Sequence, residues 1–102
     1  MSESDAGPDQ TVVAQEWLER GFSCDLASDP PDTVWEDFVH DMDELILVLE
    51  GEMELELPGE TVHLESGQEF LVPGGVLHTL RTAGAIPVVW LSGLAREHAY
   101  TD

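Results

Sequence analysis

The chain of 102 residues contains no lysine, no asparagine and a single cysteine. Its basic residues are Arg20, Arg81 and Arg96, against 22 acidic residues, so the formal net charge is −19. Proteins that bind nucleic acid or anionic membranes neutralise phosphates with clustered Lys and Arg. The composition therefore argues against both of these partners.

Long apolar runs are also absent, and none approaches the roughly 20 residues that a membrane-spanning helix needs. The first ten residues are polar and acidic, without the basic and hydrophobic regions of a secretory signal. Cys24 has no partner for an intrachain disulfide, which fits a reducing compartment. We therefore expect a cytoplasmic protein.

The excess of acids has three explanations that the sequence leaves open. An acidic surface without lysine suits a cytoplasm at very high salt, where screening shortens the reach of charge repulsion. A GC-rich genome would explain the lack of asparagine and the presence of only two isoleucines. A dedicated basic partner is the third explanation.

The length predicts one domain, because domains commonly run to about 100–150 residues. Residues 1–10 read as a flexible acidic tail with almost nothing to bury. We expect the single domain to cover residues 11–102. Residues 14–20, followed by Gly21, predict either a short helix with a glycine at its end or a β-segment.

From residue 33 onward the chain reads as short strands separated by turns. Met53, Leu55 and Leu57 alternate with glutamates, which is typical of a half-buried strand. Strands so closely spaced favour an all-β sandwich or closed barrel. The expected strands cover residues 22–26, 34–39, 44–50, 53–57, 61–64, 69–72, 78–81 and 86–91.

The strand at 44–50 bears on assembly. If Glu44, Ile46 and Val48 face the barrel interior, three leucines at 45, 47 and 49 face outward. Apolar stripes of this kind meet another element or another subunit. We therefore expect either the N-terminal segment or the second subunit of a homodimer to cover them, and we favour the homodimer.

Two histidines and a glutamate carry the predicted chemistry. His40 and Glu44 flank a short acidic bend between two expected strands, so both side chains can point into one cavity. His78 follows a Pro-Gly-Gly turn that fixes where its strand restarts. Two imidazoles and a carboxylate suit Fe(II), Mn(II), Ni(II), Co(II) or Zn(II) and leave open positions for substrate.

The two segments that contain these residues resemble the motifs of the cupin superfamily, G-x5-H-x-H-x3,4-E-x6-G and G-x5-P-x-G-x2-H-x3-N. The first matches from His40 through Glu44 to Gly51, and the second from Gly67 to His78. The resemblance covers about residues 34–91. It implies a small single-domain cupin, with a jelly-roll barrel (double-stranded β-helix) and a metal held by the two histidines and the glutamate.

Departures from the motifs, which include the absence of the opening glycine of the first motif at residues 32 and 33, limit what the resemblance implies. The family's first histidine falls at Phe38, so one of four usual ligands is missing, and the final asparagine falls at Thr82. A site with two histidines and one carboxylate still holds metal in iron oxygenases. It would hold the ion more weakly than a site with four ligands.

The sequence gives weaker indications of a role for other side chains. Phe38, Arg81 and Trp90 are expected around the ligand pocket. Asp37 and Asp43 would orient a ligand histidine or simply lie in solvent. Three further residues are expected to have no chemical role: His63 and His98 in solvent, and Cys24 as a small buried apolar side chain.

Two functions follow from these observations. The first is a metal-dependent enzyme that acts on a small molecule, such as an oxygenase or an isomerase. The second is a barrel that binds or senses a small molecule without turnover. The missing ligand at Phe38 favours the second, whereas the retained histidines and glutamate favour the first.

Overall fold

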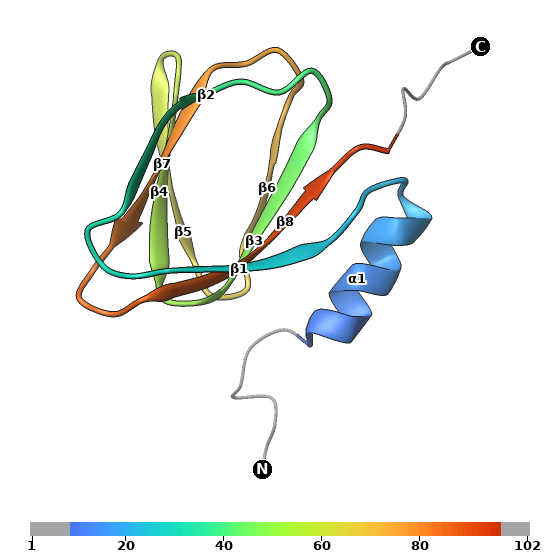
Figure 1. Cartoon of the computed structure of the whole chain (residues 1–102), viewed down its shortest axis with the longest axis horizontal. Helices are drawn as coiled ribbons and strands as arrows, with labels where there is room; N and C mark the ends of the chain where they lie inside the picture. The colour runs from blue at the N-terminus through green and yellow to red at the C-terminus, as the bar shows by residue number, and fades with distance from the viewer. Residues whose placement is uncertain (1–8, 97–102) are drawn as a thin grey trace.

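The computed structural model describes residues 9–96, which form one helix and two antiparallel sheets (Figure 1). The sheets have the strand orders β1-β8-β3-β6 and β2-β7-β4-β5. This architecture confirms the all-β, jelly-roll fold expected from the sequence. The elements are α1 (Gln10–Glu19), β1 (Asp25–Asp29), β2 (Val34–Phe38), β3 (Glu44–Glu50), β4 (Glu52–Leu57), β5 (Glu60–Glu65), β6 (Glu69–Val72), β7 (His78–Ala83) and β8 (Val88–Leu94).

The main core lies between the two sheets, and β4 shows how the sequence builds it. Its apolar residues point inward and are buried, while the glutamates between them point outward. Side chains two residues apart on a strand share one face, so this alternation is enough to orient the strand. The buried residues of this core are Ile46, Val48, Met53, Leu55, Leu57, Leu64, Val72, Leu80, Val88 and Trp90.

Helix α1 has a defined beginning and end. The Asp9 side chain accepts a hydrogen bond from the Thr11 N–H (2.8 Å) and so caps the N-terminus. At the other end Gly21 has φ +89°, and the Phe22 N–H donates to the Trp17 carbonyl (2.8 Å). This is a Schellman C-cap, in which glycine takes the left-handed conformation. The helical alternative for residues 14–20 is therefore confirmed.

A second cluster lies between α1 and the outer face of β3 and β8. Trp17 is fully buried there against Leu45, Leu47 and Leu91. The helix thus covers the outward leucines of β3, which removes the main reason for expecting a second subunit there. The homodimer stays a prediction without support from this surface.

Some boundaries differ from those expected. The first strand begins at Asp25 rather than at residue 22, because Phe22 completes the helix cap and only bridges to Ala95. The last strand runs from Val88 to Leu94, since its pairing with β3 continues as far as Leu94, which lies opposite Glu44.

The expected tail at residues 1–10 lies outside the described residues except for Asp9 and Gln10, which begin the helix. The one helix in the described part of the chain is neither long nor apolar enough to cross a membrane.

Candidate metal site

Two loops at one end of the barrel bring the predicted ligands together. The Gly75 N–H donates to the His40 carbonyl (2.7 Å), and the Gly74 N–H donates to Oδ1 of Asp43 (2.7 Å). Gly74 packs so closely that a Cβ there would overlap the carbonyl oxygen of Asp41. The Pro-Gly-Gly turn is therefore bound to the acidic bend, and Asp43 holds this turn. The side chain of Asp37 lies outside the described part of the structure.

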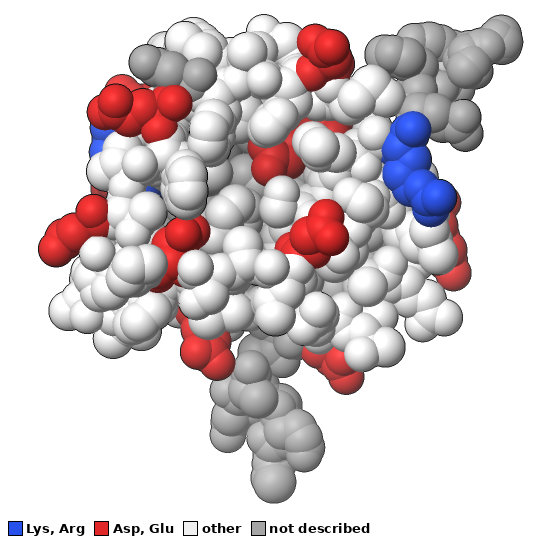
Figure 2. Space-filling model, in the orientation of Figure 1, with Lys and Arg blue, Asp and Glu red and all other residues white. Residues whose placement is uncertain are grey.

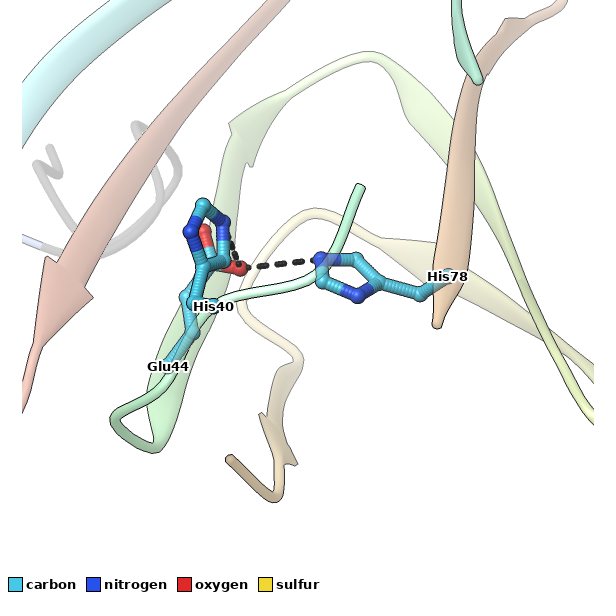
Figure 3. A group of neighbouring side chains, drawn as sticks. All are labelled: His40, Glu44 and His78. Carbon is cyan, nitrogen blue, oxygen red and sulfur yellow. Dashed lines mark hydrogen bonds and ion pairs between the residues drawn. The ribbon is translucent and has the colours of Figure 1, made fainter. Parts of the chain in front are cut away.

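Glu44 lies at the centre of the site (Figure 3). It is the first residue of β3, points into the barrel and is 4% exposed. Its Oε1 lies 3.2 Å from Nε2 of His78 and 3.5 Å from Nε2 of His40. Its other oxygen accepts a hydrogen bond from the Ser92 hydroxyl (2.9 Å). Ser92 thus orients the carboxylate so that one oxygen faces both imidazoles.

The hydrogen bonding of His78 indicates which of its ring nitrogens carries the hydrogen. Its Nδ1 lies 2.9 Å from the Val76 carbonyl, which can only accept, so Nδ1 carries the hydrogen. In the neutral ring Nε2 then has a free lone pair, and this lone pair faces a carboxylate oxygen of Glu44. Two acceptors at this distance repel each other unless a proton or a cation lies between them.

The donor set also fits a metal ion. The three donor atoms of His40, Glu44 and His78 lie within 4.8 Å of one another. Two imidazole nitrogens and a carboxylate oxygen are ligands that divalent transition metals accept. The carbonyl that orients His78 and the hydroxyl that orients Glu44 are the outer partners that such ligands usually have.

The site is closed on one side and open on the other. The side chains of His78 and Glu44 are 1% and 6% exposed, whereas that of His40 is 35% exposed. Water or a small molecule would therefore reach the donor atoms past His40.

Phe38 occupies the position where the family motif has its first histidine. It is the strand partner of His78, and its ring centroid lies 6.2 Å from that of His78 and 6.1 Å from that of His40. A hydrocarbon ring therefore faces the site where a fourth ligand would approach.

The other two residues expected in the pocket lie elsewhere in the described structure. Trp90 packs in the core between the sheets and donates its indole N–H to Asp29 (3.0 Å). Arg81 contacts Glu56 (2.9 Å) on the outer face of its sheet. Of the three expected pocket residues, Phe38 has ring contacts with the site histidines.

A second group of possible ligands lies on the exposed surface. Nε2 of His63 is 3.2 Å from Glu52 and 3.9 Å from Glu65, and all three side chains are at least 44% exposed. His63 faces outward as expected. Within residues 9–96 these are the two groups whose donor atoms come close enough for one ion.

Cys24 is partly buried beside the helix cluster. Burial and, to a smaller extent, the neighbouring Asp25 raise the pKa of its thiol above the ordinary value, which keeps it protonated at neutral pH. A reactive thiolate is thus not favoured here. His98 lies outside the described residues.

The sequence did not point to the two groups that orient the ligands. Ser92 lies beyond the expected end of the last strand, and the role of Val76 depends on its carbonyl, which every residue has. The alternation of Trp90 and Ser92 on one face of β8 was the available signal for Ser92, since Trp90 faces the core.

Comparisons with known proteins agree with this fold. A family model described as a cupin domain matches residues 26–93. The structure is similar to that of TT1209 from Thermus thermophilus, with 28% identity, 72% of this chain and 71% of that chain covered, and a TM-score of 0.67.

Two further solved structures are similar. One is the Cupin_2 domain of an XRE family transcriptional regulator from Enterobacter cloacae (25% identity, 80% of this chain and 90% of that chain, TM-score 0.68). Another is the polyketide cyclase RemF from Streptomyces resistomycificus (27% identity, 74% of this chain and 55% of that chain, TM-score 0.65). The comparison with curated proteins found no match. Because the family model spans more than half of the chain, including all three candidate ligands, the chain belongs to the cupin family.

Proposed function

We propose that this cupin holds one divalent transition metal through His40, Glu44 and His78 and acts on a small molecule that binds at the open positions. One observation carries the proposal: Nε2 of His78 lies 3.2 Å from Glu44 Oε1, and Nε2 of His40 lies 3.5 Å from the same oxygen. With the hydrogen of His78 on Nδ1, a cation bound by both Nε2 and Oε1 removes the repulsion between them. Fe, Mn, Ni, Co and Zn all suit the donor set.

The residues around the site support an enzyme of the oxygenase or isomerase type. A bound metal would polarise an oxygen of the substrate or activate a bound water. Ser92 and the Val76 carbonyl hold two of the ligands in a fixed geometry, and the buried sides of Glu44 and His78 keep bulk water out. A similar cupin structure, that of RemF, is named as a polyketide cyclase.

The second candidate is a barrel that binds or senses a small molecule without turnover. Phe38 favours it, because a phenyl ring replaces one usual ligand and would weaken the hold on the metal. One similar structure is a cupin domain of a transcriptional regulator, where it belongs to a larger protein. In this function the metal would be structural or absent.

Elemental analysis of the purified protein tests the metal. We expect about one transition-metal ion per chain in the wild type and in the surface control His63→Ala, and none in His78→Ala. Because His78 is buried, His40→Ala provides a second variant at an exposed position, and circular dichroism checks that each variant folds. A wild-type protein without metal, or metal lost only in His63→Ala, contradicts the proposal.

Turnover separates the two functions. Metal-loaded protein would be incubated with a panel of small molecules and followed by mass spectrometry and thermal melting. Product that disappears in His78→Ala establishes an enzyme. A ligand that raises the melting temperature without product establishes a binding barrel, because ligands stabilise the state that binds them.

A further inference from the structure

Four neighbouring rings extend from the half-exposed Trp35 to the buried His78. The centroids of Trp35 and Phe38 are 5.9 Å apart with nearly parallel planes (26°). Phe38 lies 6.1 Å from His40 and 6.2 Å from His78, and the two histidines are 5.5 Å apart. Trp35 is 44% exposed, whereas His78 is 2% exposed. The two histidines of the candidate site therefore lie directly beside an aromatic surface formed by Phe38 and Trp35.

An irregularity in β2 brings Trp35 and Phe38 to the same face. The register with β7 shifts between Trp35 and Phe38, as at a β-bulge. In a regular strand residues three apart point to opposite faces, but one extra residue returns the second of them to the same face. Trp35 pairs with the core residue Leu80, and Phe38 pairs with His78, so both rings lie on the inner face of the sheet.

Trp35 differs from the other two tryptophans of the chain. Trp17 and Trp90 are buried and donate their indole N–H groups to Glu69 (3.2 Å) and Asp29 (3.0 Å). Trp35 is half exposed and packs on Phe38, and no acceptor for its N–H is found among the described side chains. Its position thus offers a flat apolar face beside the open side of the site.

The charge of the protein further limits which ligands are expected to bind. The net charge is −19, and two of the three arginines are already paired, Arg20 with Glu69 and Arg81 with Glu56. An anionic ligand would meet a strongly negative surface. An uncharged molecule avoids this cost and can still bring an oxygen to a metal.

We propose that Trp35 and Phe38 form the wall against which the ligand of the metal site stacks, so that the site selects planar, unsaturated, uncharged molecules with an oxygen donor at one edge. The donor part of this inference rests on the proposed metal. The wall does not, because it is built from side chains that bind no ion.

Two hydroxamic acids test the wall. Benzohydroxamic acid and cyclohexanecarbohydroxamic acid carry the same metal-binding group, but the first has a planar ring and the second a saturated one. Affinities would be measured by calorimetry, and by intrinsic tryptophan fluorescence, for zinc-loaded and metal-free protein. The variants are Trp35→Leu, Phe38→Leu and, as a control on the outer face of β2, Val34→Ala.

In the loaded wild type we expect the planar probe to bind about two- to tenfold more tightly than the saturated one, as aromatic contacts predict. Trp35→Leu and Phe38→Leu should remove this preference without changing zinc content, and Val34→Ala should keep it. Equal affinities in the wild type, or a preference that survives both wall variants, would overturn the wall. If zinc content is normal but the planar probe binds no better than the saturated one, the wall is rejected and the metal proposal stands. If the protein binds no zinc but still prefers the planar probe, and Trp35→Leu removes this preference, the metal proposal is rejected and the wall stands.

Discussion

The two histidine–glutamate clusters of this protein contain the same kinds of side chain in very different surroundings. In the inner cluster, His40, Glu44 and His78 come from a loop and two strands at one end of the barrel. In the outer cluster, Glu52, His63 and Glu65 lie on the neighbouring strands β4 and β5, where Glu52 is the direct partner of Glu65. Figure 2 shows that acidic side chains are also scattered over the face in view.

The difference lies in burial and orientation. Glu44 and His78 are shielded from water and held by a hydroxyl and a carbonyl, so their donor atoms have one arrangement. The outer side chains are at least 44% exposed, and their ion pairs are worth at most about 1 kcal/mol. His63 lies between the two glutamates on the open surface, so water reaches all three side chains. Ligand type alone therefore does not identify a metal site.

Replacing one glutamate in each cluster should give the largest contrast. Glu44→Gln removes a charged ligand from the inner site, and we expect metal affinity to fall by more than about a hundredfold, the upper end of the effect of residues that only orient ligands. Glu52→Gln should leave affinity unchanged. Competition with a fluorescent chelator measures both. Equal losses in the two variants would show that the clusters do not differ as proposed.

Removing the hydroxyl that orients Glu44 should have the next largest effect. Ser92→Ala frees Oε2 of Glu44, and we expect metal affinity to fall by about 10- to 100-fold while one ion still binds at saturation. Ser28→Ala, at a surface position on β1, is the matched control. An unchanged affinity in Ser92→Ala would mean that burial alone orients the carboxylate.

Restoring the missing ligand should raise the metal affinity of the inner site. Phe38→His places a fourth donor opposite His78, and we expect metal to bind at least about tenfold more tightly, which equals about 1.4 kcal/mol. The same change removes one ring of the proposed wall. If affinity stays constant or falls, the position of Phe38 does not reach the ion.

Salt should act on the outer surface and leave the inner site alone. Raising KCl from about 0.1 M to about 1 M shortens the screening length from about 10 Å to about 3 Å. Repulsion among the exposed acids then weakens, so we expect a rise of several degrees in melting temperature. Metal content should stay constant. A melting temperature independent of salt would favour genome composition as the source of the acidity.

Much of the fold could be predicted because its signals are local. The alternation of Met53, Leu55 and Leu57 with glutamates identified β4, and the glycine turns separated most of the strands. The helix could not be chosen over a strand, because residues 14–20 are compatible with both until Trp17 packs on Leu45. The end of β8 was missed, since its last residues are strand only through pairing with β3.

The sequence by itself predicted the barrel and named His40, Glu44 and His78 as candidate ligands, because alternating burial and motif spacing are patterns along the chain. Only the tertiary structure decided which oxygen of Glu44 faces the histidines, because Ser92 reaches it from another strand. It also decided that Trp35 and Phe38 share a face, because the bulge in β2 appears only in its pairing with β7.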